Sequence, residues 1–187
     1  TIAMLINGER VQAANGAVFE RRNPLDGTVA TRAPAATSED ARRAVDAAAA
    51  AFPAWAAMGP TERRALLMRA AQALEAKGDA FAAAMAAETG ASALWAGFNV
   101  HLAASGLQEA AAMVTQIAGE IIPSDVPGSL AMGVRQPAGV VLGIAPWNAP
   151  VILAVRAIAL PLACGNTVVL KGSEVSPATH GLIIEAL

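Results

Sequence analysis

The stretch GVVLGIAPWNAPVILAVRAIALPLACGNTVVLKG, residues 139–172, decides the fold of this chain. Its two ends, GVVLGIA (139–145) and NTVVLKG (166–172), are short apolar segments, and the segment between them has helix-like spacing. Short, continuously apolar strands that alternate with helices are typical of a parallel sheet buried on both faces. A second helix is expected to follow, with Ser176 as its N-cap and Pro177 in its first position. The β-α-β-α order predicts an α/β fold.

Four regions are expected along the chain. Residues 1–36 predict small antiparallel strands, and residues 37–119 predict a helical region. Residues 120–137 predict a two-stranded ribbon, and residues 138–187 predict the start of the parallel fold. Because one parallel pair cannot form a stable open sheet, and Leu187 falls within a helical pattern without a stop signal, we expect the protein to continue beyond it.

Local signals set the expected boundaries of these elements. The Asn-Gly pair at residues 7–8 and the Asp-Gly pair at residues 26–27 are signals for hairpin turns. Thr37 and Asp40 have the spacing of a capping box and predict the start of the first helix. The expected ends of the four helices are Pro53, Gly78, Gly90 and Gly119.

Composition excludes several classes of function. The chain has 187 residues, is 55% hydrophobic and has a net charge of −2, so no basic surface predicts a nucleic-acid partner. A single cysteine excludes a disulfide framework and favours an intracellular, cytoplasmic setting. The uncharged run at residues 137–155 is about long enough to cross a bilayer. Its three prolines and Asn148 argue against a membrane span, although a membrane-anchored α/β protein stays as an alternative.

Position in the predicted sheet indicates where a ligand would bind. In open α/β sheets, ligands bind beyond the carboxyl ends of the strands. The segment APWNAP (145–150) follows the first predicted strand, and KGSE (171–174) follows the second. These segments would be neighbours if the two strands pair. No G-x-G-x-x-G follows the first strand, so an ordinary dinucleotide-binding loop is not predicted.

Three side chains in these segments have two interpretations each. Asn148 is either a turn residue that closes its own backbone or a donor to developing negative charge on a substrate oxygen. Lys171 and Glu174 are either solvated loop charges or a pair that binds the hydroxyl groups of a ribose. In the second interpretation Glu174 would also repel a 2′-phosphate and thereby favour NAD over NADP.

The remaining candidate residues are expected to be structural. Cys164 is expected to be an inert core residue, because no base is near it in the sequence. His101 and His180 are expected to be structural, and no residues have the spacing of metal ligands. Trp147 could line a pocket, and the helix charges are expected on solvated faces. Two tryptophans are expected in the core, namely Trp55 and Trp95.

The same motifs resemble the aldehyde dehydrogenase superfamily. The segments GVVLGIAPWNAP and GNTVVLKGSE match its pattern, and NPLDGTV, ERR and GEIIPSD match its upstream layout. In finer detail the motifs look most like the salicylaldehyde and vanillin dehydrogenases, which act on aromatic aldehydes. The resemblance covers essentially the whole chain, which looks like the N-terminal part of such an enzyme and of its Rossmann-like cofactor domain.

The resemblance implies a role for each candidate residue. Asn148 resembles the asparagine of the oxyanion hole, and Lys171 and Glu174 resemble the clamp on the adenosine ribose of NAD. Four residues resemble the backbone segment that lines the cofactor and substrate tunnel, namely Ile144, Ala145, Pro146 and Trp147. The family's nucleophilic cysteine and general-base glutamate would lie beyond residue 187, and Cys164 is not at the nucleophile's position.

The activity implied is NAD-dependent oxidation of an aromatic aldehyde to the acid through a thiohemiacetal, by a homodimer or homotetramer that uses the ribbon. The chain alone would be inactive. The alternative is a non-catalytic cofactor-binding or assembly module of the same fold. Two positions depart from the common pattern: Ala149 replaces a phenylalanine, and Gly172 replaces a proline.

Overall fold

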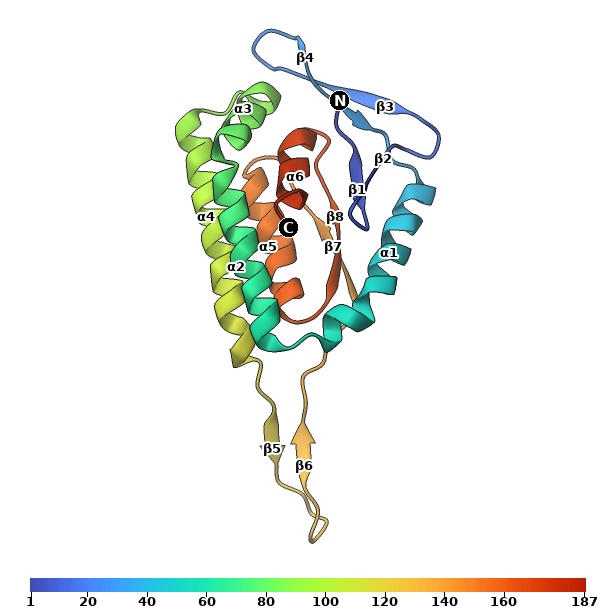
Figure 1. The fold of residues 1–187 in the computed structure, drawn as a ribbon, viewed down its shortest axis with the longest axis vertical. Coiled ribbons are helices and arrows are strands. Elements are labelled where there is room, and N and C mark those ends of the chain that lie inside the picture. Colours follow the sequence, from blue (N-terminus) through green and yellow to red (C-terminus); the bar gives the residue numbers. More distant parts are fainter.

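The computed structural model describes residues 1–187. It contains six α-helices and four two-stranded sheets, of which one is parallel. The helices and the parallel pair form a layered body, and one antiparallel ribbon projects from it (Figure 1). The predicted α/β class is therefore confirmed.

The first hairpin has the predicted turn. β1 (Met4–Ile6) pairs antiparallel with β2 (Glu9–Val11). Asn7 and Gly8, between the strands, have φ angles of 52° and 77°. Asn and Gly adopt this left-handed conformation most readily, which is why the Asn-Gly pair predicts the turn correctly.

The second hairpin has a longer connection than its Asp-Gly signal suggests. β3 (Val18–Arg22) pairs antiparallel with β4 (Val29–Pro34). Asp26 accepts a hydrogen bond from the Thr28 N–H at 2.9 Å, and Gly27 has a φ of 74°. The Asp-Gly pair therefore shapes part of a loop rather than forming a two-residue turn.

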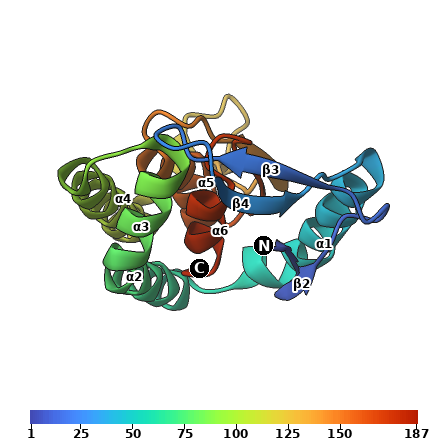
Figure 2. The ribbon, with the colours of Figure 1, turned by 90° about the horizontal axis from the view of Figure 1, so that it is seen from above.

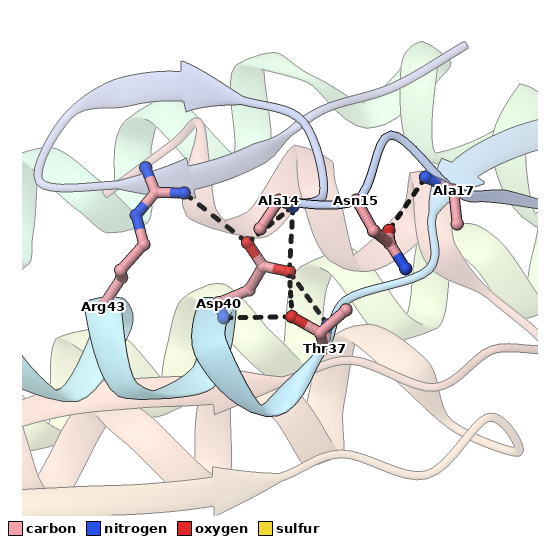
Figure 3. A network of polar contacts seen from close by, with 6 residues as sticks. All are labelled: Ala14, Asn15, Ala17, Thr37, Asp40 and Arg43. Carbon is pink, nitrogen blue, oxygen red and sulfur yellow. Dashed lines mark hydrogen bonds and ion pairs between the residues drawn. The ribbon is translucent and has the colours of Figure 1, made fainter.

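Four helices follow, as predicted, and the first begins with the expected capping box. Asp40 accepts a hydrogen bond from the Thr37 N–H at 2.9 Å, and the Asp40 N–H donates to Thr37 Oγ1 at 3.4 Å (Figure 3). Asp40 also accepts the Ala14 N–H at 3.0 Å, which ties the N-terminal strands to this helix. The hydrogen bond from Thr37 is the main cause that holds the pKa of Asp40 below its usual value. The helix bounds are α1 Ser38–Ala57, α2 Pro60–Ala76, α3 Gly78–Thr89 and α4 Ala93–Met113.

The predicted end of α1 at Pro53 is wrong, because the helix continues for another turn. The Trp55 indole N–H donates to the Leu162 carbonyl at 3.1 Å, and α1 packs on the parallel strands. These tertiary contacts offset the backbone hydrogen bond that proline removes. The predicted stop at Gly78 is confirmed, because α2 ends at Ala76 with Lys77 as its C-cap, and Gly78 then begins α3. Gly90 ends α3 as predicted, with a φ of 70°.

The predicted end of α4 at Gly119 is wrong as well. The helix ends at Met113, and residues 114–116 form a single 3₁₀ turn. Val114 is buried in the core, but every residue from 115 to 119 is exposed. Helices in proteins depend on burying an apolar face, and this face ends at Val114.

The predicted ribbon is present after α4. β5 (Glu120–Ile122) pairs antiparallel with β6 (Ala131–Gly133), and the pair extends away from the body (Figure 1). Its apolar side chains are largely open to solvent, with Ile121 78% exposed and Met132 60% exposed. The ribbon thus contributes little to the core of this chain.

The decisive stretch forms the predicted parallel unit. Its elements are β7 (Val140–Ile144), α5 (Pro150–Ala163), β8 (Thr167–Lys171) and α6 (Pro177–Ile184). The strands β7 and β8 pair in parallel along their whole lengths. None of the six helices combines the length and apolarity that a bilayer span requires, and residues 137–155 are divided between β7, a loop and α5.

The body is layered around this unit. The strands β7 and β8 contact α1 on one face and α5 on the other, and α4 packs between α5 and α2. Seen from above, α1 lies on the opposite side of the body from α2, α3 and α4 (Figure 2). The packing is tight at Gly143, where a Cβ atom would lie 3.1 Å from the Ala157 Cβ and 3.3 Å from Leu170 Cδ1. Gly143 therefore allows α5 to lie close to the sheet.

The expectation that helix charges are solvated is wrong for three buried residues. Asp40 is 1% exposed, Arg63 is 8% exposed and Glu88 is 0% exposed. The Arg63 guanidinium donates to the Ala163 carbonyl at 2.9 Å and to the Met58 carbonyl at 2.6 Å. A cation at the C-terminus of a helix is favourable, so Arg63 stabilises the end of α5. Each of the three charges has at least one hydrogen-bond partner in a distant segment of the chain.

Candidate functional site

Two loops leave the parallel strands at the same edge. Loop 145–149 follows β7, and loop 172–176 follows β8. Ile144 and Lys171 are paired at the ends of the two strands, and the Ala145 N–H donates to the Lys171 carbonyl at 3.0 Å. The prediction that these two loops are neighbours is therefore confirmed. The edge is the one at which open α/β sheets bind ligands.

Asn148 lies in the first of these loops with its side chain exposed. The nearby hydrogen bonds are made by backbone groups, including the bond from the Leu153 N–H to the Ala149 carbonyl at 3.0 Å. None involves the Asn148 amide, so the interpretation that this side chain closes its own turn does not hold. Both N–H groups of the amide are free to donate to a ligand.

The N-terminus of α5 adds a favourable field beside Asn148. Ala149 is the N-cap residue and provides no side-chain hydrogen bond, and Pro150 is the first helical residue. The first N–H groups of a helix have no partner within it, and they make its N-terminus partly positive. This end of α5 and the Asn148 amide would together stabilise negative charge on a bound oxygen atom.

The residues around Asn148 divide into one buried and three exposed side chains. Ala145 is 3% exposed and belongs to the core, so only its backbone can contact a ligand. Ile144 is 67% exposed and Trp147 is 54% exposed. Pro146 is also exposed. The expected tunnel segment therefore has three side chains open to solvent in this chain.

Lys171 and Glu174 form an ion pair in the second loop. The Lys171 Nζ lies 3.1 Å from the Glu174 carboxylate, and the two side chains are 58% and 71% exposed. The pKa of Glu174 lies below its usual value, first because of the hydrogen bond from the Glu174 backbone N–H and second because of Lys171. The exposure of the pair agrees with the interpretation as solvated loop charges. The pair also presents a donor and an acceptor side by side. This arrangement suits the hydroxyl groups of a sugar.

His180, expected to be structural, is buried beneath the second loop. Its Nδ1 accepts the Ser173 N–H at 2.9 Å, and the residue is 4% exposed. Burial lowers the pKa of His180 to about 4, the nearby Pro150 carbonyl opposes this change, and Lys171 adds to it. The ring is therefore neutral at neutral pH. Since Nδ1 accepts a hydrogen bond, the proton is on Nε2.

The prediction that Trp95 is a core residue is wrong. Trp95 and Phe98 are 40% and 48% exposed, and their stacked rings have centroids 5.5 Å apart. With Ser92 and Leu94 they line a shallow apolar hollow on the first turns of α4. Because α4 is apolar on most of its surface, spacing alone could not identify its exposed side. Trp55, the other predicted core tryptophan, is half-buried.

The hollow lies at the end of the molecule where α5 also begins. The helices α4 and α5 pack together, and both run away from this end (Figure 1). The Cβ position at Gly106 of α4 lies 3.7 Å from Val155 of α5. This contact shows how the two helices are aligned along their lengths. With a rise of about 1.5 Å per residue, the first turns of α4 are thus near the level of the Asn148 loop.

Cys164 is exposed, so the prediction that it is a core residue is wrong. It is the C-cap residue of α5, where its N–H bonds to the Leu160 carbonyl at 2.9 Å and the side chain faces outward. His101 is exposed on α4. No three His, Cys, Asp or Glu residues are grouped as metal ligands would be.

Comparisons with known proteins agree with this geometry. A family model described as the aldehyde dehydrogenase family matches residues 11–187. A vanillin dehydrogenase from Pseudomonas fluorescens is 63% identical over 186 residues, which cover 100% of this chain and 38% of that protein. The chain therefore spans well under half the length of the relatives that it matches.

Two solved structures have the same fold. A salicylaldehyde dehydrogenase from Pseudomonas putida G7, in complex with salicylaldehyde, superimposes with a TM-score of 0.97 at 50% identity over 99% of this chain and 38% of that one. PnpE from Pseudomonas sp. WBC-3, in complex with nicotinamide adenine dinucleotide, superimposes with a TM-score of 0.95 at 35% identity over 99% of this chain and 38% of that one.

Proposed function

The chain belongs to the aldehyde dehydrogenase family, and we propose that it is the N-terminal part of an enzyme that oxidises an aromatic aldehyde to the carboxylic acid with NAD. The observation that supports this most is the pairing of β7 with β8, which brings Asn148 and the Lys171–Glu174 pair to one edge of the sheet. One loop suits a developing oxyanion and the other suits the ribose of a cofactor.

Asn148 is proposed to donate to the aldehyde oxygen when a thiolate from the rest of the enzyme attacks the carbonyl carbon. Negative charge develops on this oxygen in the tetrahedral thiohemiacetal, and a fixed donor stabilises it more than it stabilises the neutral aldehyde. The exposed, unbonded amide and the adjacent N-terminus of α5 support this role.

Lys171 and Glu174 are proposed to bind the adenosine ribose of NAD, which supplies the hydride acceptor of the reaction. The ion pair fits this group because Lys171 donates to a hydroxyl oxygen and Glu174 accepts from a hydroxyl group. A carboxylate at this point would also repel the 2′-phosphate of NADP. The low pKa of Glu174 keeps the carboxylate charged at neutral pH.

The Glu174→Gln substitution in the complete enzyme is expected to weaken discrimination against NADP. Removing the negative charge removes the repulsion, so the ratio of kcat/KM for NAD to that for NADP is expected to fall by about tenfold. Initial rates with each cofactor measure the ratio. Glu62→Gln, at an exposed position on α2, is the matched control. An unchanged ratio in Glu174→Gln would show that Glu174 does not face the ribose.

The aromatic substrate class has two lines of support. Two of the similar proteins named above are a vanillin and a salicylaldehyde dehydrogenase. The hollow around Trp95 and Phe98 presents stacked aromatic faces at the end of the body where Asn148 lies. We propose that the ring of the aldehyde packs against this aromatic pair.

The Trp95→Ala substitution is expected to raise KM for an aromatic aldehyde by about three- to tenfold, the usual worth of an aromatic–aromatic contact. The KM for a short aliphatic aldehyde should stay unchanged, because such a substrate has no ring to stack. Trp95→Phe keeps an aromatic face and should restore most of the aromatic affinity. Equal changes in KM for the two substrates would exclude a direct contact with the ring.

The wider organisation is also a proposal. We propose that residues 1–187 are a partial NAD-binding domain with the four regions given above. The exposed apolar side chains of the β5–β6 ribbon support its use in a homodimer or homotetramer. A chain with one exposed cysteine and no disulfide is suited to the reducing cytoplasm.

The direct test is to purify the complete protein and to follow cofactor reduction with vanillin, salicylaldehyde and a short aliphatic aldehyde. Oxidation of the aromatic aldehydes with NAD is expected. A protein that binds NAD but oxidises none of these aldehydes, and that has no cysteine nucleophile in the remaining sequence, would instead be the non-catalytic module.

A further inference from the structure

The loop between β8 and α6 is held to the body of the protein through one buried side chain. Loop residue Ser173 donates its N–H to His180 Nδ1 at 2.9 Å, and both residues are buried. Within the loop, the Val175 N–H donates to Ser173 Oγ at 3.1 Å, and the Ser176 N–H donates to the Ser173 carbonyl at 3.2 Å. The loop therefore folds around Ser173, and His180 fixes the position of Ser173.

Gly172 is matched to this histidine. A Cβ atom at Gly172 would lie 3.1 Å from the His180 Cβ and 3.2 Å from its Nδ1. A side chain at position 172 would therefore press on the imidazole or displace the loop. The absence of a side chain here, where proline is the common residue of the resemblance, allows a ring as large as imidazole to sit directly under the loop.

The bond acts at the centre of the proposed cofactor clamp. Ser173 lies between Lys171 and Glu174, whose side chains are exposed and form their ion pair 3.1 Å apart. We infer that His180 is a positioning residue for the cofactor: its Nδ1 holds the Ser173 N–H and so fixes the backbone from which Lys171 and Glu174 extend. This inference rests on the proposed role of these two side chains in binding the ribose.

The geometry requires an acceptor at the Nδ1 position rather than bulk alone. Asparagine places its side-chain oxygen near that position, since Oδ1 and Nδ1 are both bonded to Cγ. Glutamine fills more of the volume, but its polar atoms lie one bond further out. Comparing His180→Asn with His180→Gln therefore separates the hydrogen bond from packing.

The test is steady-state kinetics of the complete enzyme with NAD as the varied substrate. His180→Gln is expected to raise KM for NAD by about five- to tenfold, the effect of losing one hydrogen bond, with kcat at saturating NAD nearly unchanged. His180→Asn is expected to restore KM to near the wild-type value. KM values for NAD that are equal in the Asn and Gln variants would overturn the inference, as would a fall in kcat without a rise in KM.

Two further variants distinguish this inference from the proposed function. Lys171→Ala removes one side of the clamp directly and should raise KM for NAD. If it does so while the two His180 variants match the wild type, only the positioning role is wrong. If Lys171→Ala also leaves KM unchanged, the clamp itself is wrong. Gly172→Ala presses a Cβ atom on His180 from the loop side and leaves the imidazole itself unaltered. This variant should also raise KM for NAD.

Discussion

Replacing Asn148 with alanine is expected to lower kcat for aldehyde oxidation by about 10²–10³-fold, the usual effect of removing one oxyanion donor. The loss should appear in kcat rather than in KM, because the hydrogen bond strengthens only when the aldehyde oxygen becomes negative. The amide is exposed and makes no hydrogen bond within the chain, so its removal leaves no buried group unsatisfied. The variant should therefore fold normally, and single-turnover rates of the complete enzyme measure the effect.

Two other variants sharpen this test. Asn148→Asp has nearly the same shape but places a negative charge beside the oxyanion, so it should be less active than Asn148→Ala. Asn15→Ala removes an exposed amide that only accepts the Ala17 N–H at 2.9 Å, far along the chain from the site, and should keep wild-type kcat. A loss of less than about tenfold in Asn148→Ala would contradict the role of oxyanion donor.

The sequence predicts the parallel unit well because its signals are local. Two short apolar segments, the helix between them and the polar residues at their ends all lie within residues 139–176. Once β7 and β8 pair, chain direction alone brings Asn148 and Glu174 to the same edge. For this reason the order of these residues along the chain is enough to select the candidate site.

Predictions fail where a distant segment decides the outcome. Pro53 does not end α1, because the indole of Trp55 bonds to Leu162, 107 residues further along the chain. Cys164 and Trp95 lie in apolar sequence yet are exposed, since the packing of neighbouring helices selects which side of each helix is buried. No periodicity in a helix that is apolar on most sides contains that information.

The largest omission concerns Glu88, which sequence analysis assigns to a solvated face. Ser176 is at the predicted N-cap of α6, but its hydroxyl makes no hydrogen bond. Glu88 of α3 caps the helix instead. Its carboxyl group accepts the Ala178 N–H at 2.7 Å, the Thr179 N–H at 3.0 Å and the Thr179 hydroxyl at 2.8 Å, and Thr179 lies 91 positions further along the chain than Glu88. Because the capping residue lies so far from α6 along the chain, no sequence pattern near α6 indicates it.

Glu88→Ala is therefore expected to reduce the free energy of unfolding by about 3–5 kcal/mol, among the largest effects of single substitutions. The substitution leaves the Thr31 hydroxyl, which donates to Glu88 at 2.8 Å, and the first N–H groups of α6 buried without an acceptor. Denaturant unfolding of the complete protein measures the loss. Glu109→Ala, at an exposed position on α4, should change stability by less than about 0.5 kcal/mol.

Hydrogen exchange locates the same effect within the structure. In Glu88→Ala, the amides of Ala178 and Thr179 should exchange much faster than in the wild type, whereas amides in the middle of α2 should keep their protection until global unfolding. Glu88→Gln keeps one acceptor oxygen but turns an NH₂ group toward a donor, so its loss should be smaller than that of alanine and still larger than that of Glu109→Ala. Because α6 carries His180, loosening its N-terminus should also raise KM for NAD. Wild-type protection of Ala178 and Thr179 in Glu88→Ala would show that another group caps α6.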